Sequence, residues 1–236
     1  MTASETLTIG PEFFGFEGIG HGGYTSGLLA EHLPGSLEVK ILQPPPLDTP
    51  MQLSTEDGQL TLTHADLVIA RARRKALSMG VPPAPSLALA GQSMAFNRDL
   101  VEHPSPTCMT CGPQRDLGQG LRVFVGPSDD GELVAGSWVP HPNFADAEGN
   151  VRTPFVWAAL DCPTYWAIRA GYGQQGRMVT GRLTVQTIAP VPTGSPCIVL
   201  GWPDQRKGGR LFVSGAAIVT PEGEPLAVAE AVWMSA

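Results

Sequence analysis

Two short segments of the sequence carry residue types suited to acyl-group chemistry. The first is His21-Gly22-Gly23, placed directly before an apolar run. Glycines at the start of a helix leave unpaired backbone N–H groups open to an oxygen atom, because glycine has no Cβ. The second segment places Asp161 after the apolar run 155–160. Burial raises the pKa of such a carboxyl group, which can then act either as a general base or as a nucleophile.

The cysteines offer a second kind of chemistry. Cys108 and Cys111 form a CxxC pair, while Cys162 and Cys197 stand far from it in the sequence. A structural zinc site needs four ligands, and we expect the last two cysteines to lie inside the second half of the chain, away from the pair. No thioredoxin-like pattern surrounds the pair either. The sequence therefore predicts thiols that pack or pair locally, with no bound metal.

A basic cluster suits a phosphorylated ligand. Arg71, Arg73 and Arg74 fall within the segment RARRK. Guanidinium groups bind phosphate in a bidentate manner, as the phosphates of coenzyme A require. The alternative is a solvated strand end. A second basic patch, with the same two interpretations, comprises Arg206, Lys207 and Arg210.

Large aromatic side chains near these segments are candidates for an acyl pocket. We predict substrate contacts from Tyr24 and Trp157, and Trp166 and Trp233 also lie near the expected helix or the last strand. Core packing is the alternative role for the tryptophans. No P-loop, GxGxxG, GxSxG or HExxH motif is present, so serine-based hydrolysis has no support in the sequence.

Composition limits the classes of partner. The 236 residues carry a formal net charge of −7, which gives no reason to expect nucleic acid or an acidic membrane surface. No window approaches 18 consecutive apolar residues, and we expect a cytoplasmic protein without a secretory signal. With 28 glycines and 23 prolines but 42% hydrophobic residues, the chain is expected to fold into many strands and turns.

The two halves of the chain resemble each other. The segment 37–50 aligns without a gap on 183–196, with two leucine or valine matches and three proline matches. A repeat of this length indicates a duplicated domain rather than a solenoid. We predict an N-terminal repeat, a connector rich in proline, serine and glycine, and a C-terminal repeat, over residues 1–80, 81–119 and 120–236.

Alternating and β-branched residues predict the strands, and apolar runs predict two helices. Thr153 is the expected N-cap of the second helix, and Pro163 is expected to kink it just after Asp161. The expected helices are 22–33 and 154–170, and the expected strands are 36–43, 49–55, 59–64, 67–74, 121–126, 132–138, 179–189, 196–202, 209–220 and 225–234.

With these segments in place, the chain resembles the hotdog-fold acyl-CoA thioesterases of the phenylacetate-pathway type. Their motif places His-Gly-Gly at the start of the central helix and an acidic residue nine positions after the histidine. The first half keeps His21-Gly22-Gly23 but has Ala30 at the ninth position. The second half has Arg152-Thr153-Pro154 and keeps Asp161. Each half retains the part of the motif that the other lacks.

The resemblance implies an α+β double hotdog, in which each of two repeats wraps a long antiparallel sheet around a central helix. It also implies one thioesterase site between the repeats, formed by His21, Gly22, Gly23 and Asp161. In that site the Gly22 amide donates to the thioester oxygen, and Asp161 is base or nucleophile. Coenzyme A is part of the substrate, no separate cofactor or metal is expected, and a homo-oligomer is possible.

Two other classes remain open. A non-catalytic acyl-CoA or lipid binder would use Asp161 as a structural residue. A hotdog hydratase or dehydratase is the other class, and the resemblance implies that such an enzyme uses an aspartate and a histidine close together on one helix. No histidine lies near Asp161 in the sequence, which counts against this class. The sequence does not fix the acyl group, the choice between coenzyme A and acyl carrier protein, or the oligomeric state.

Overall fold

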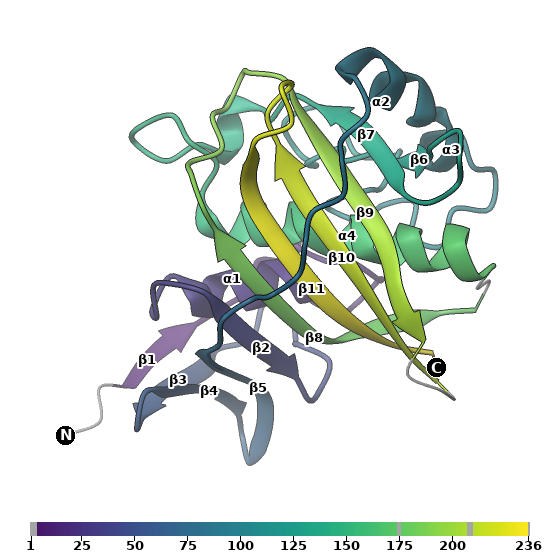
Figure 1. Ribbon diagram of the computed structural model, residues 1–236. Helices are drawn as coiled ribbons and strands as arrows, with labels where there is room; N and C mark the ends of the chain where they lie inside the picture. Colours follow the sequence, from purple (N-terminus) through teal and green to yellow (C-terminus); the bar gives the residue numbers. More distant parts are fainter. Residues whose placement is uncertain (1–3, 174–175, 207–209, 236) are drawn as a thin grey trace.

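The computed structural model describes residues 4–173, 176–206 and 210–235. Within these residues eleven strands form one antiparallel sheet, and the helices α1 and α4 lie on one of its faces (Figure 1). The strands are β1 (Ser4–Leu7), β2 (Leu37–Ile41), β3 (Met51–Glu56), β4 (Gln59–His64), β5 (Leu67–Arg74), β6 (Gly126–Pro127), β7 (Val134–Trp138), β8 (Met178–Thr187), β9 (Cys197–Arg206), β10 (Leu211–Val219) and β11 (Pro225–Ser235). The helices are α1 (Gly22–Ala30), α2 (Leu87–Ser93), α3 (Ala95–Arg98), α4 (Thr153–Tyr172) and a 3₁₀ turn (Pro142–Phe144).

The strand order repeats on the two sides of the sheet. Outward from the middle, the first half runs β2, β5, β4, β3 and β1, and the second half runs β8, β11, β10, β9 and β7. In each half the first strand after the helix α1 or α4 lies innermost, and the strand before that helix lies outside the second strand after it. The duplicated fold predicted from the sequence is therefore present in the topology.

The two halves join through equivalent strands. Leu37 pairs with Val185, and Val39 pairs with Leu183, in an antiparallel ladder between β2 and β8. The sequence alignment makes Leu37 equivalent to Leu183 and Val39 equivalent to Val185. Leu37 therefore pairs with the equivalent of Val39, and Val39 pairs with the equivalent of Leu37. This reciprocal pairing is expected for two copies of one unit related by a local two-fold axis.

The helices α1 and α4 pack against each other with their backbones close. A Cβ on Gly23 would lie 2.7 Å from the Trp157 carbonyl oxygen, and a Cβ on Gly27 would lie 2.4 Å from the Pro154 Cα. Since Gly23 faces the middle of α4 and Gly27 faces its start, the helices run antiparallel. The two glycines, one turn apart, allow a helix contact that any larger residue would prevent. This contact brings the start of α1 next to Asp161.

Helix α4 begins and continues differently from expectation. Its N-cap is Arg152, and Thr153 is the first helical residue, so the predicted Thr153 cap was wrong by one position. The helix runs through Pro163 to Tyr172. Pro163 lacks the N–H that would bond to the Ala159 carbonyl, and in the same part of the helix the Thr164 hydroxyl donates to the Asp161 carbonyl at 2.6 Å. A kink after Asp161 stays a prediction.

Other differences lie where packing decides the local structure. The predicted strand 121–126 has only its last residue in a strand, although its side chains are largely buried. The strand β1 and the short helices α2 and α3 were not predicted, and α1 ends at Ala30 rather than Leu33. Tertiary contacts override weak local patterns in such short segments.

The segment after β5 crosses the opposite face of the sheet (Figure 1). Leu77, Met79 and Val81 pack there against a second apolar cluster that includes Ile198 and Trp202. The chain covers a sheet face that would otherwise expose apolar side chains. Beyond it the chain passes through α2 and α3 and returns to the other face at Cys108 and Cys111, which belong to the main core.

Candidate active site

A cavity with an accessible volume of about 180 Å³ opens beside the start of α1. Its size is close to that of cavities that hold one small ring. Segments of both halves and of the chain between them contribute to its wall, and most of the lining is apolar. The lining residues fall within 15–22, 41–45, 103–111, 161–165, 179–180 and 233–234.

Asp161 lines this cavity with a carboxylate that is only 2% exposed. Its Oδ2 accepts a hydrogen bond from the Gly23 amide at 3.0 Å, and its Oδ1 accepts one from the Thr180 hydroxyl at 3.0 Å. Burial raises the pKa of Asp161, although His21 and the two donors act in the opposite direction. The side chain therefore has one fixed orientation and is readily protonated, as a general base requires.

His21 is the N-cap of α1 and lies between two groups of titratable side chains. Its Nδ1 accepts from the Tyr24 amide at 3.3 Å and lies 3.7 Å from Oδ2 of Asp161. Its Nε2 lies 3.4 Å from the Cys162 sulfur. The imidazole thus contacts the carboxylate on one side and a cysteine on the other. Burial lowers the pKa of His21, but the Cys108 thiolate and Asp161 raise it by more, so the net pKa is raised.

Gly22 supplies the first backbone amide of α1 and also lines the cavity. The amides of Gly23, Tyr24 and Thr25 have acceptors. For the Gly22 amide, the structure gives no acceptor among the residues it describes. A free N–H at a helix N-terminus attracts an oxygen that carries negative charge. Gly22 and Asp161 line the same cavity.

The other predicted substrate contacts do not line the cavity. Trp157 is 2% exposed and lies within the core, and Tyr24 stacks on Phe13 with ring centroids 4.3 Å apart. The exposed side chains of the basic cluster stand on β5, and Arg73 binds Glu38 at 3.0 Å. The cluster residues Arg71, Arg73 and Arg74 are absent from the cavity wall. Trp233, one of the aromatic candidates, does line the cavity. Tyr165 also lines the cavity but was not predicted from the sequence.

The second basic patch lies partly outside the description. Lys207 lies outside the described residues, and Arg206 is described only by its backbone, as the last residue of β9. The Arg210 side chain donates to the Ser235 carbonyl at 2.8 Å.

The start of α4, which corresponds to the start of α1, is built differently. The Arg152 guanidinium lies over the Phe155 ring, 4.6 Å from its centroid. Phe155 in turn contacts Phe144, Phe13 and Tyr24, with ring centroids 4.8 to 5.8 Å apart. Aromatic side chains therefore pack around the start of α4, whereas the start of α1 has glycines and lines the cavity.

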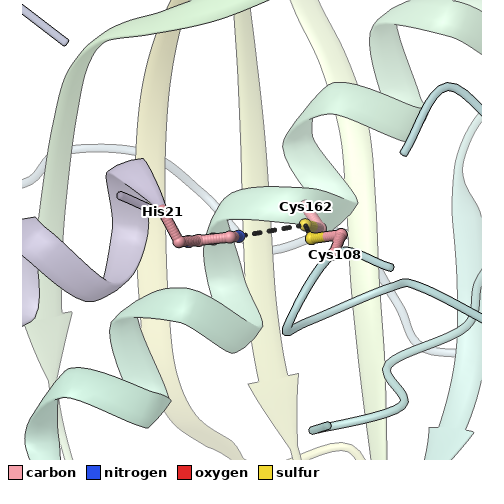
Figure 2. A group of neighbouring side chains, drawn as sticks. All are labelled: His21, Cys108 and Cys162. Atoms are coloured by element: carbon pink, nitrogen blue, oxygen red, sulfur yellow. Dashed lines mark hydrogen bonds between the residues drawn. The ribbon is translucent and has the colours of Figure 1, made fainter. Parts of the chain in front are cut away.

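The structure corrects the expectation for the cysteines. Cys162 was expected to lie away from the CxxC pair, but its sulfur is 3.9 Å from the Cys108 sulfur (Figure 2). The cause is the fold: the segment 103–112 returns to the start of α1, where Cys162 directly follows Asp161 in α4. Cys197 lies elsewhere, with its thiol donating to the Trp138 carbonyl at 3.2 Å.

Three further residues at the cavity had no signal in the sequence. Thr180 comes from β8 and holds the catalytic candidate Asp161. His103 lines the cavity with its Nδ1 accepting from the Ser105 amide, which leaves a buried Nε2 without a hydrogen-bond partner. The exposed Arg177 lies over Phe16, a lining residue, with its guanidinium carbon 4.4 Å from the ring centroid. Only the fold brings these residues together.

Known structures resemble this chain over its whole length. A tesB protein of Mycobacterium avium subspecies paratuberculosis has a TM-score of 0.65 at 14% identity, covering 99% of this chain and 93% of that chain. A candidate thioesterase of Novosphingobium aromaticivorans has 0.66 at 13% identity, covering 99% and 96%. A hot dog fold protein of unknown function from Alicyclobacillus acidocaldarius has 0.65 at 13% identity, covering 100% and 96%.

No protein-family model matches the sequence, and no curated protein matches it either. At identities this low, the structural likeness establishes the fold and leaves activity to be argued from the site. Among the described residues, no helix combines the length and apolar character needed to cross a lipid bilayer. The resemblance inferred from the sequence is confirmed at the level of architecture: the chain has the hotdog fold, in two copies that share one sheet.

Proposed function

We propose that this protein hydrolyses an acyl thioester at a single site between its two repeats. The observation that carries the proposal is that Asp161 and Gly22 line one apolar cavity. Asp161, from the second repeat, brings a buried carboxylate, and Gly22, from the first, brings the first backbone amide of α1. Neither repeat supplies both groups.

The chemistry follows from these two groups. The thioester carbonyl oxygen accepts from the Gly22 amide, whose position at the start of α1 favours the negative charge that develops during attack. A water oxygen attacks the carbonyl carbon while Asp161 takes the water proton. The carbon–sulfur bond then breaks, Asp161 returns its proton to the leaving thiolate, and the products are a carboxylic acid and a thiol. The removal of one such amide donor typically costs about 3 kcal/mol of activation free energy.

Direct attack by Asp161 is the alternative route. The carboxylate oxygen would displace the thiolate and form a mixed anhydride, which water then hydrolyses. Both carboxylate oxygens keep a lone pair beyond their hydrogen bonds to Gly23 and Thr180, so both routes are available. The test of the route is a single turnover in ¹⁸O-labelled water. If an anhydride forms and water attacks it at the Asp161 carboxyl carbon, the label remains in the enzyme. If Asp161 acts as a base, the label appears only in the product.

The substrate carrier is proposed from the cavity rim. The Arg177 guanidinium is exposed and stacked on Phe16, where it can bind a phosphate of coenzyme A. It takes the role first assigned to the cluster on β5, whose members do not line the cavity. The small accessible volume favours a short or aromatic acyl group. The names of the tesB protein and of the Novosphingobium relative agree with thioester chemistry on this fold.

The test is thiol release from a panel of aromatic and straight-chain acyl-CoA thioesters, with acyl-carrier-protein thioesters and enoyl-CoA substrates beside them. We expect turnover on at least one thioester. Binding of acyl-CoA without turnover would overturn the proposal in favour of a binding protein. Hydration of an enoyl-CoA without thiol release would identify a hydratase, a reaction that the contact between His21 and Asp161 leaves open.

A further inference from the structure

We propose that His21, Cys108, Cys111 and Cys162 form a zinc site next to the active-site carboxylate. Three of these residues place a ligand atom each within 4.8 Å of one another, and all are buried. Figure 2 shows His21 pointing its ring nitrogen toward the sulfur atoms of Cys108 and Cys162. They come from the start of α1, the segment between the repeats, and the middle of α4.

The distances match the edges of a zinc tetrahedron. With Zn–S near 2.3 Å and Zn–N near 2.05 Å, tetrahedral angles place two sulfurs about 3.8 Å apart and sulfur and nitrogen about 3.6 Å apart. The Cys108 and Cys162 sulfurs are 3.9 Å apart, and Nε2 of His21 is 3.4 Å from the Cys162 sulfur. Two of the three distances thus match the edges of a zinc tetrahedron, and the third, between the His21 imidazole and the Cys108 sulfur, is within 4.8 Å.

Cys111 supplies the fourth ligand. Its buried thiol lies three residues from Cys108 on the same loop but outside the group of ligand atoms within 4.8 Å of one another, so it has to move toward the group on coordination. The CxxC spacing lets two sulfurs approach the same ion, as in many structural zinc sites. Three cysteines and one histidine then complete a closed tetrahedron that leaves no position for substrate. Such a donor set of soft sulfur atoms and imidazole is selective for zinc over magnesium or calcium.

The burial of the cluster agrees with a metal site. Cys108, Cys111 and Cys162 are free cysteines in the interior of the protein. Buried thiolates are unfavourable unless they are paired or coordinated to a metal.

Zinc would also connect this cluster to Asp161. Coordination uses Nε2 of His21 in its unprotonated form, so the ring proton resides on Nδ1. Nδ1 lies 3.7 Å from Oδ2 of Asp161, and Nδ1–H would donate to that oxygen in place of accepting from the Tyr24 amide. A metal-bound histidine that donates to a carboxylate is a common arrangement. His21 is then a positioning residue, and this last step rests on the proposed function.

The direct test is metal analysis of the whole protein, purified under reducing conditions and dialysed against zinc-buffered solution. We expect about one zinc ion per chain, as a closed four-ligand site requires. Substitution of Co²⁺ should give the visible absorption and thiolate charge-transfer bands of a tetrahedral site with cysteine ligands. Neither readout needs a substrate. The zinc proposal can therefore be refuted while the thioesterase proposal stands, and the thioesterase proposal can be refuted while the zinc proposal stands.

Three variants assign the ligands. Cys108→Ser and Cys162→Ser should abolish stoichiometric zinc and the cobalt charge-transfer bands, and chelation should lower the Tm of the wild-type protein but not of these two variants. Cys197→Ser is the matched control, because Cys197 is also buried and hydrogen bonded but lies outside the cluster. It should keep one zinc ion. Cys111→Ser should weaken binding and alter the cobalt spectrum.

Four results would overturn the proposal. The first is wild-type protein that holds no stoichiometric zinc after reconstitution, and the second is a disulfide between two of the three cysteines in protein purified under reducing conditions. The third is an equal zinc content in Cys108→Ser and the wild type, and the fourth is an unchanged cobalt spectrum in Cys111→Ser. The disulfide result would instead identify a redox pair. Circular dichroism and hydrodynamic radius establish whether each variant is folded before its zinc content is compared.

Discussion

The hydroxyl of Thr180 sets the acidity of the proposed catalytic carboxylate, so Thr180→Val should shift the pH dependence of turnover. Oδ1 of Asp161 accepts from this hydroxyl at 3.0 Å, and the bond favours the ionised carboxylate. The isosteric valine removes the donor and keeps the shape. Because the ionised form loses a partner, the pKa of Asp161 rises further above 3.8.

The size of the shift follows from the hydrogen bond. A bond to a charged group contributes about 1.5–3 kcal/mol. A protonated carboxyl group can also bond to the hydroxyl, so about half of that value distinguishes the two forms. This corresponds to about one pKa unit. The acidic limb of kcat/KM should therefore move up by about one pH unit, with about a tenfold loss of activity below the limb and little loss above it.

Thr184→Val is the matched control for this experiment. Thr184 lies on the same strand, is fully buried, and its hydroxyl has no hydrogen-bond partner. Its replacement should leave the pH profile unchanged and should not destabilise the fold. The assay is thiol release across the pH range for the wild type and both variants. An acidic limb at the same pH in wild type and Thr180→Val would refute the assignment of the limb to Asp161.

Three further predictions concern packing, substrate binding and the number of sites. Gly23→Ala should destabilise the fold by about 1–3 kcal/mol in urea unfolding, because its Cβ would lie 2.7 Å from the Trp157 carbonyl oxygen. Gly91→Ala in α2 should be neutral or slightly stabilising, because its Cβ meets only ordinary contact, and equal effects would contradict this packing. Arg177→Ala should raise KM for an acyl-CoA about fivefold with kcat retained, whereas Arg74→Ala should not, and a reversed result would return the phosphate site to β5. Calorimetric titration with a non-hydrolysable acyl-CoA analogue should give one molecule per chain, and two would contradict a single shared site.

Most of the architecture could be predicted because the duplicated pattern is strong. Alternation over 59–64 and 67–74 gave strands with those bounds, and the apolar run around Asp161 gave a buried helix. The matching of Leu37 and Val39 with Leu183 and Val185 indicated the repeat, and the structure adds that these equivalent strands join the halves. Buried, periodic segments carry their own signal.

The candidate site could be predicted only in part. His21, Gly22, Gly23 and Asp161 were found because their spacing in two incomplete motifs is complementary, and the structure brings them together. Thr180, His103 and Arg177 could not be found, because each occupies its place through the path of a strand or connector. Cys162 was misjudged for the same reason: 50 or more residues of intervening chain determine whether two cysteines meet.

The short elements were missed for a different reason. Strand β1 has only four residues, and α2 and α3 are short helices in a segment rich in proline and serine. Such elements form because neighbouring strands and apolar clusters stabilise them, and not because of their own propensity. The segment 121–126 shows the converse, since it is apolar and buried but lacks a partner strand over most of its length.

The central claim, hydrolysis of a thioester by the carboxylate of Asp161, is tested most directly by comparing Asp161→Asn with the wild type in thiol release. Asparagine keeps the shape, since its oxygen can accept from the Gly23 amide and its amide can donate to a rotated Thr180 hydroxyl. We predict a folded variant that binds the non-hydrolysable analogue with unchanged Kd but turns over substrate at least about 10²–10⁴-fold more slowly. An unchanged kcat in the folded variant would contradict the account.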